Sequence, residues 1–303
     1  MHAYTGQFAA LLTAFLWMLS ALCWTAAGER VGSLAVNVVR LMVALPLLVL
    51  LARLTGEPAM PWSASPETWL WLGLSGVCGF FLCDLFLFKA FLLIGPRLGM
   101  LFLSLAPPLT ALIGWLMLDE HLSPTNWLGM ALTLGGVLWV VAESPAAPGD
   151  SGRRYVFTWR GGLAALAAAV AQAVAMVLAK RGLLPGDVSD VGATEIRLIA
   201  GLACFLALVL ALRRHGRVAE AFAQPRTMRI ILLGALVGPV LGVTTMMMAI
   251  RRIPAGLAQT FLSLSPVLII PFMRLIYRER VGSNAVAGAL LACLGVALLF
   301  AGK

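Results

Sequence analysis

The amino-acid sequence predicts an all-α membrane protein of ten transmembrane helices, built from two inverted five-helix repeats. Of its 303 residues, 61% are hydrophobic and only 12% are charged, whereas a soluble domain has about 25% charged residues. A spanning helix needs about 20 mostly apolar residues, so ten helices would use about 200 residues and leave only short loops. An internal repeat divides these helices into two sets of five. The composition argues against a soluble enzyme, a DNA-binding module and a secreted disulfide scaffold.

The basic charge of the chain points to a membrane surface. The net charge is +9, from 22 Lys and Arg against 13 Asp and Glu. In a soluble protein such an excess would suggest nucleic acid. Here the bases lie mostly in short runs between apolar segments, where membrane orientation and lipid headgroups account for them. We therefore expect the lipid bilayer, and no nucleic acid, as a partner.

Motifs for metals, nucleotides and disulfides are missing from the sequence. The five cysteines all lie inside apolar runs and form no CxxC pair, which is typical of small core residues. The three histidines fall at the N-terminus or in loops, so we expect no metal site. The chain has no Walker sequence, and no GxGxxG sequence follows a strand. We therefore expect no cofactor and no ATP-driven pumping.

Five apolar segments make up the first half of the chain. They cover about 7–27, 32–52, 68–92, 98–118 and 127–142. A polar, Pro-rich stretch over 55–67 follows the second segment, and Gly95-Pro96-Arg97 breaks the chain before the fourth. The first segment is too long for a signal peptide and no Lys or Arg precedes it.

Five further segments follow a central linker. Residues 143–158 combine Pro, Gly, Ser and charge near the midpoint of the chain, so the predicted domains are repeat 1–142, linker 143–158 and repeat 159–303. The segments of the second half cover about 159–179, 191–212, 228–250, 255–277 and 283–300. The stretch 213–229, which carries five arginines, is predicted as the longest loop of this half.

An offset of 159 residues aligns the two halves. It places FLSLAP at 102–107 on FLSLSP at 261–266, and it pairs Glu120 with Glu279 and Gly136 with Gly295. An offset of 157 pairs Arg40 with Arg197. Agreement of Ser, Pro, Glu and Gly indicates an internal duplication. Because each repeat has an odd number of spans, the second enters the membrane from the opposite side, an arrangement common in secondary transporters.

The duplicated motif carries a family resemblance. The pattern FLSL-A/S-P, a Glu thirteen residues after the Pro, and a glycine-bearing final helix occur twice. With Trp17 in the first helix and an arginine early in the second, the sequence resembles the EamA-type transporters of the drug/metabolite transporter superfamily over about residues 7–301. The resemblance implies a ten-helix bundle that exports or exchanges small metabolites, typically amino acids. It names no substrate.

Ionisable groups inside apolar segments are the first site candidates, because each costs about 2.5–3.5 kcal/mol at the centre of a spanning helix. Arg40 lies well inside the second segment, with Asn37 about one turn earlier. The matched Arg40 and Arg197 either bridge helix ends and carbonyls or contact substrate. Asp84 is the only acid deep in a segment, and its repeat counterpart is Val243. It forms a salt bridge to Arg40 or another helix, or serves a substrate amine or proton coupling. Lys89 either extends to the interface or belongs to the site.

Uncharged residues complete the candidate set. Ser104 and Ser263 belong to the duplicated motif, and Pro107 and Pro266 are candidate hinges because a proline inside a helix frees a carbonyl and bends the helix. Two amides and two larger side chains either line a cavity or pack between helices; these are Gln172, Gln259, Trp17 and Met247.

The predicted function is secondary transport, as an exporter or exchanger, by alternating access around a central cavity. The expected substrate is a small polar or amphipathic metabolite such as an amino acid or amine, and proton coupling, exchange and facilitated diffusion stay open. The protein is expected in the cell (inner) membrane, multi-pass, as a monomer or homodimer. A flippase or transporter of lipophilic or lipid-linked cargo is the alternative. An intramembrane enzyme or a scaffold is remote, since the sequence has one deep acid and no buried histidine.

The distribution of bases predicts that both termini face the outside. With both termini inside, as the family resemblance implies, the inner loops would hold six Lys and Arg and the outer loops fourteen. The positive-inside rule favours the reverse orientation. A tag placed after Lys303 is therefore expected to be cleaved by protease added to intact cells; a tag that becomes accessible only after lysis would contradict this orientation.

Overall fold

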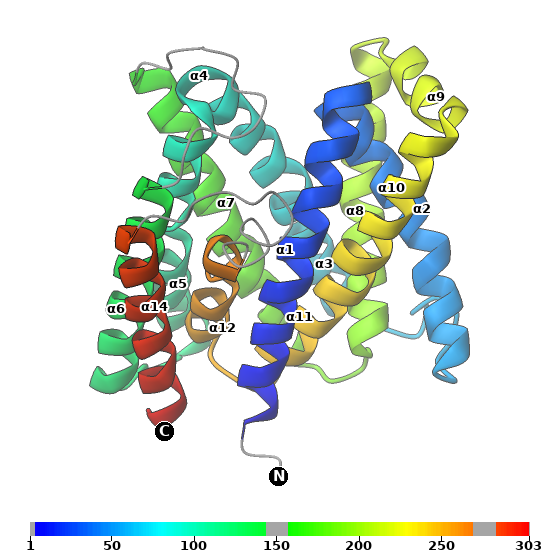
Figure 1. Cartoon of the computed structure of the whole chain (residues 1–303). Coiled ribbons are helices and arrows are strands. Elements are labelled where there is room, and N and C mark those ends of the chain that lie inside the picture. Colours follow the sequence, from blue (N-terminus) through cyan, green and yellow to red (C-terminus); the bar gives the residue numbers. More distant parts are fainter. Residues whose placement is uncertain (1–3, 144–156, 269–282, 303) are drawn as a thin grey trace.

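The computed structural model describes residues 4–143, 157–268 and 283–302, and this part of the chain is helical, with no strand. Eight of its helices are long and apolar enough to cross a membrane, and Ala255–Leu268 and Val286–Ala301 are shorter apolar helices. The chain is a multi-pass membrane protein. Its two ends lie at the same end of the helical bundle (Figure 1).

The helices of the first half begin and end at identifiable residues. They are α1 (Thr5–Val31), α2 (Ser33–Leu54), α3 (Pro66–Gly76), the π-helix η1 (Val77–Cys83), α4 (Asp84–Leu103), α5 (Ala106–Leu118) and α6 (Pro124–Glu143). Gly32 separates α1 from α2 with a φ of +82°, and Gly95 interrupts α4 with a φ of +84°. Only glycine adopts such angles readily. The Ser65 hydroxyl caps α3 by accepting the Thr68 N–H at 3.2 Å.

The second half follows the same plan. Its helices are α7 (Trp159–Leu183), α8 (Asp190–Ala211), α9 (His215–Ala223), α10 (Pro225–Ala235), the π-helix η2 (Leu236–Gly242), α11 (Val243–Ile250), α12 (Ala255–Leu262) and α14 (Ser283–Ala301). The hydroxyls of Thr158 and Ser189 cap α7 and α8. The linker residues 144–156 and the predicted apolar stretch 269–277 lie outside the described residues.

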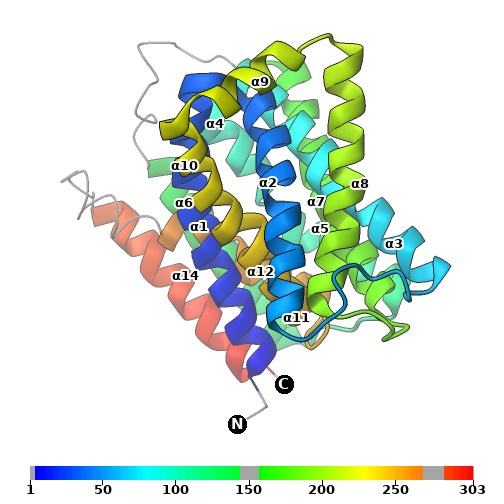
Figure 2. The ribbon, with the colours of Figure 1, turned by 90° about the vertical axis from the view of Figure 1, so that its right-hand side faces the viewer.

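The loop predicted over 213–229 is wrong, because α9 and the start of α10 occupy it. The arginines hide an apolar face: Val218 and Ala221 pack against Val31 and neighbouring residues of α1 and α2. Figure 2 shows α9 across the end of the bundle beside α2. A short amphipathic helix therefore stands where charge alone indicated a loop.

The two halves are packed against each other reciprocally. Helix α1 contacts α10, η2 and α11, while α7 contacts α3, η1 and α4. Matched helices also pair across the two halves: α2 with α8, α5 with α12 and α6 with α14. Figures 1 and 2 show the first and last of these pairs side by side. Much of the core therefore forms only between the repeats.

The two π-helices lie at the repeat offset. Val77 and Cys83 bound η1, and Leu236 and Gly242, each 159 positions later, bound η2. A π-helix replaces i→i+4 hydrogen bonds with i→i+5 bonds and is frequent at functional sites. Pro239 in η2 has no N–H to donate. The sequence predicted regular helices here, because an uninterrupted apolar run gives no sign of the change in hydrogen bonding.

The duplicated FLSL motif marks a two-residue break in the helix at 104–105, inside the span Leu98–Leu118, whereas the sequence predicts the kink at the proline itself. Helix α4 ends at Leu103 and α5 begins at Ala106, so Pro107 lies in a first turn, where its missing N–H costs no hydrogen bond. The second copy breaks after Leu262 in the same way. The Ser104 hydroxyl donates to Leu101 O at 2.6 Å, and the Ser263 hydroxyl donates to Thr260 O at 2.7 Å.

Glycines bring α6 and α14 into close contact. A Cβ on Gly129 would lie 2.7 Å from Leu299 Cδ2, and a Cβ on Gly288 would lie 3.0 Å from Gly136 O. Small residues at such positions are typical of helix pairs in membranes, where packing replaces the hydrophobic effect.

Two neighbouring glycines of α6 give a matched test of this packing. A Cβ at Gly136 would overlap the backbone of Ala292 and Gly288, whereas at Gly135 the nearest atom is Leu291 Cδ2 at 3.9 Å. We expect Gly136→Ala to lower the free energy of unfolding by about 1–3 kcal/mol. Gly135→Ala should leave it unchanged or raise it by up to about 1 kcal/mol. Unfolding in detergent measures both; equal effects of the two substitutions would contradict the packing.

Candidate functional site

A cavity of about 320 Å³ lies between the two halves. Both repeats line it, and matched elements contribute: η1 with η2, and the FLSL motif of each half. Most of the wall is apolar, with the indoles of Trp17 and Trp24 and the ring of Phe80 among its side chains. The cavity therefore combines an apolar surface with the few polar groups described below, as ligand sites commonly do.

Most of the sequence-predicted candidates lie in this cavity. The lining includes Trp17, Arg40, Asp84, Ser104, Gln172, Arg197, Gln259 and Ser263, together with the prolines Pro107 and Pro266. Three candidates are not in the lining. Asn37 is buried between helices, Lys89 is exposed, and Met247 is fully buried in the core.

An ion pair joins α2 to α4 at the cavity wall. The Arg40 guanidinium donates to the Asp84 carboxylate, and the two side chains are 14% and 21% exposed. The guanidinium carbon lies 5.4 Å from the centre of the Trp24 ring, a cation–π arrangement. The sequence left open whether Asp84 pairs with Arg40 or with another helix, and in the structure it pairs with Arg40. The two opposite charges leave this part of the wall with no net charge.

Arg197 on α8 has no such partner in the part of the chain that the structure describes. Its residue is 4% exposed, its Nη1 lies 3.7 Å from Met247 Sδ, and its guanidinium carbon lies 5.7 Å from the Phe80 ring centre. Its buried Nε has no hydrogen-bond partner there. The matched position of Asp84 is Val243, which also lines the cavity but carries no charge.

Glycines of α3 and η1 allow α8 to approach these two elements closely at Arg197. A Cβ on Gly76 would overlap the Arg197 backbone, and a Cβ on Gly79 would lie 3.2 Å from Arg197 Nη2. Any larger side chain at either position would displace the arginine.

Amides add uncharged polar groups to the wall. Gln172 comes from α7 and Gln259 from α12. Gln259 is buried, and its Oε1 has no hydrogen-bond partner among the described residues. The motif hydroxyls of Ser104 and Ser263 donate to their own helices. The amides are therefore freer than the serines to bond a ligand.

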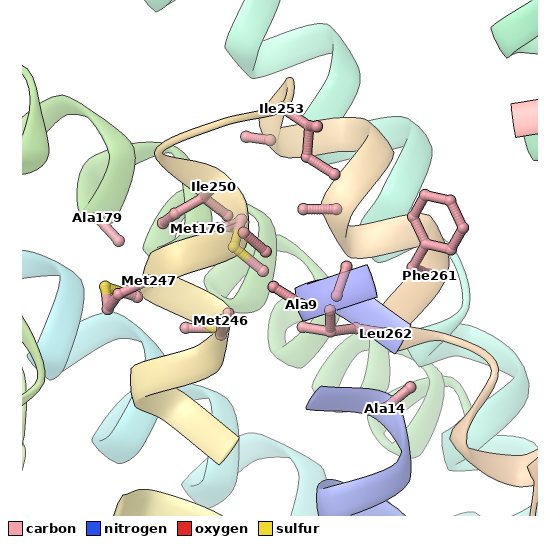
Figure 3. Close-up of a cluster of buried hydrophobic side chains, with 14 of the residues drawn as sticks. Ala9, Ala14, Met176, Ala179, Met246, Met247, Ile250, Ile253, Phe261 and Leu262 are labelled. Atoms are coloured by element: carbon pink, nitrogen blue, oxygen red, sulfur yellow. The ribbon is translucent and has the colours of Figure 1, made fainter. Parts of the chain in front are cut away.

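A methionine-rich core supports one wall of the cavity. Figure 3 shows Met176, Met246, Met247 and Ile250 around α11. Met246 and Met176 also line the cavity, whereas Met247 contacts Arg197 from within the core. Adjacent methionines thus have different surroundings, a distinction that the sequence Met246-Met247-Met248 did not reveal.

A buried network closes the bundle at the end where Gly6 contacts Ile253. Glu120 forms an ion pair with Lys180 of α7 and accepts the Ala255 N–H of α12 at 2.8 Å. Lys180 also donates to Ile253 O at 2.7 Å. Glu120 therefore caps the start of α12 and pairs with a base of α7. The repeat counterpart Glu279 lies outside the described residues.

Comparisons with known proteins agree with this arrangement. The model of the EamA-like transporter family matches residues 4–142 and 159–301. The Bacillus subtilis (strain 168) protein "Uncharacterized transporter YwfM" is 38% identical over 101 residues, which span 32% of this chain and only 32% of that relative. A solved structure described as "Crystal structure of protein" has a TM-score of 0.77 at 19% identity, over 97% of this chain and 95% of that chain. At this identity the likeness shows a shared fold alone.

Breaking the Arg40–Asp84 pair is expected to destabilise the protein more than removing it whole. Asp84→Asn or Arg40→Gln leaves one charge buried without its partner, at a cost of about 3 kcal/mol, the low end for buried pairs because both groups keep some exposure. The double variant should recover most of this loss. Unfolding of all four proteins in detergent measures the coupling, and purely additive losses would contradict it.

Proposed function

The chain belongs to the EamA-like transporter family, and from this premise we propose that it is a secondary transporter of a small polar or amphipathic metabolite. An amino acid or an amine is the substrate type considered first, moved by export or exchange. The observation that carries the proposal is the cavity between the repeats, whose apolar wall holds Arg40, Asp84 and Arg197. Ionisable groups within a membrane bundle are expensive and mark substrate or ion pathways.

We propose ten spans in two inverted five-helix repeats, 1–142 and 159–303, joined by a linker over 143–158. The reciprocal packing of the halves supports this architecture. So does the direction of α1 and α7: Gly6, near the start of α1, and Lys180, near the end of α7, both contact Ile253. The first helices of the two halves therefore run in opposite directions, as inverted repeats require.

Alternating access is the proposed mechanism. The network of Glu120, Lys180 and the start of α12 supports a closed state at one end of the bundle. The helix breaks before Pro107 and Pro266 are the proposed hinges. A short non-helical stretch between two rigid helices lets one helix rotate relative to the other, whereas a continuous helix resists such rotation. Both prolines line the cavity, so a change at either hinge alters the site.

A lipophilic or lipid-linked cargo is the second candidate, favoured by the predominantly apolar wall of the cavity. Family membership points away from enzyme activity. Uptake of water-soluble solutes into proteoliposomes distinguishes the two transport proposals, since a flippase would move only membrane-inserted cargo.

Replacing Asp84 tests whether the cavity is the transport site. A thermal-shift screen of amino acids, amines, nucleosides and sugar phosphates on the purified protein selects the solute, and counterflow in proteoliposomes measures its transport. Per folded protein, Asp84→Asn should lower the rate roughly tenfold or more, about 1.4 kcal/mol of activation free energy. Asp119→Asn is the matched control, because that side chain is 92% exposed. Equal rates in wild type and Asp84→Asn would remove Asp84 from the site.

The same vesicles test proton coupling. If the Asp84 carboxylate carries a proton during the cycle, an imposed pH gradient should drive net flux in the wild type and not in Asp84→Asn. A flux that does not change with the pH gradient would support exchange or facilitated diffusion instead.

A further inference from the structure

We infer that Arg197 binds the anionic group of the substrate, so that the cavity takes a small amphipathic carboxylate in preference to an amine. The inference rests on the proposal that this cavity is the substrate site and narrows the class of substrate. Its basis is a difference between the repeats: Arg40 has an acid partner, and Arg197 lines the cavity without one among the described residues.

The charge of the described lining favours an anion. Its three charged residues are Arg40, Asp84 and Arg197. Arg40 and Asp84 are joined in an ion pair, so their charges cancel and Arg197 leaves one positive charge. This net charge would repel a cationic substrate, and the Asp84 carboxylate that could bind its ammonium already pairs with Arg40.

The hydrogen-bonding state of Arg197 favours the same ligand. A guanidinium has five N–H donors in a planar fork that matches a carboxylate bidentately. Here the guanidinium contacts the sulfur of Met247 and the face of the Phe80 ring, while its Nε is buried without a partner among the described residues. A buried cation in this state has unused donors, and a carboxylate in the cavity that Arg197 lines would satisfy them.

The surrounding wall accommodates an apolar body. Trp17, Phe80, Leu87 and Met246 are among the lining residues. The volume of about 320 Å³ is at the small end of ligand sites, which span about 300–1,000 Å³. An aromatic or branched aliphatic monocarboxylate has a suitable size, with the amides of Gln172 and Gln259 available for further polar groups.

Three probes of nearly equal shape separate charge from size. The purified wild-type protein is titrated by calorimetry with 3-phenylpropionate, 3-phenylpropanol and 3-phenylpropylamine. We expect the carboxylate to bind roughly tenfold or more tighter than the alcohol, and the amine to bind most weakly. Tighter binding of the amine or the alcohol, or no binding of the carboxylate, would overturn the inference. This comparison needs no variant.

Variants then assign the effect to Arg197. Arg197→Gln should weaken carboxylate binding roughly 10- to 100-fold and leave the alcohol nearly unchanged. Arg197→Lys should fall between, because it keeps the charge and loses the fork. Arg252→Gln removes an exposed arginine and should bind like the wild type. Unchanged carboxylate affinity in a folded Arg197→Gln protein would overturn the assignment.

Counterflow of the three probes separates this inference from the transport proposal. Transport of the amine or alcohol with no preference for the carboxylate would overturn the anion inference and leave a transporter. Tight, Arg197-dependent binding of the carboxylate without transport of any probe would support the anion site and count against its role in secondary transport.

Discussion

Close contact between the two repeats is the constraint on which the rest of the structure depends. In a bilayer, lipid tails are as apolar as leucine, so helices associate through packing and polar contacts. The chain meets this requirement with glycines at α6–α14 and at the approach of α8 to α3 and η1. Because α1 packs on α10, η2 and α11 of the other half, and α7 packs on α3, η1 and α4, neither repeat has a complete core alone. The cavity lies where this packing is interrupted, beside η1 and η2.

Duplication builds the scaffold symmetrically, and substitutions on it make the site asymmetric. The π-helices, the helix breaks and the serine bonds occur in both halves at one offset. The charges do not. Asp84 accompanies the first arginine, whereas Val243 occupies its matched position. Lys180 holds Glu120 at one end of the bundle, while its counterpart at the repeat offset is Ala21. A site that selects an asymmetric ligand requires such differences between the halves.

The sequence predicts most of the framework because membrane insertion leaves a strong signal in hydropathy. Apolar runs located the helices, and the FLSL motif located the repeat together with Ser104, Pro107, Ser263 and Pro266 of the cavity lining. The features that the sequence does not predict are those that depend on three-dimensional geometry. Hydrogen-bond register in η1 and η2 leaves no mark in an apolar run, and the face of α9 that packs on Val31 is masked by its arginines. Which residue pairs with Asp84 depends on which helices meet. So does the difference between Met246, which lines the cavity, and Met247, which is buried in the core.

Arg40 and Arg197 occupy matched positions in the two halves but have different surroundings. Asp84 neutralises the charge of Arg40 within the protein, through a hydrogen bond from one guanidinium nitrogen, so an anionic ligand would compete there with a carboxylate already in place. Arg197 is held by packing against Phe80 and Met247, contacts that fix its position without consuming its strongest donors. This arrangement lowers the stability of the empty protein, because the buried charge of Arg197 has no acid partner among the residues that the structure describes. A bound anion would pair with this charge and so stabilise the occupied protein. Occupancy of the cavity is therefore coupled to the stability of the interface between the repeats.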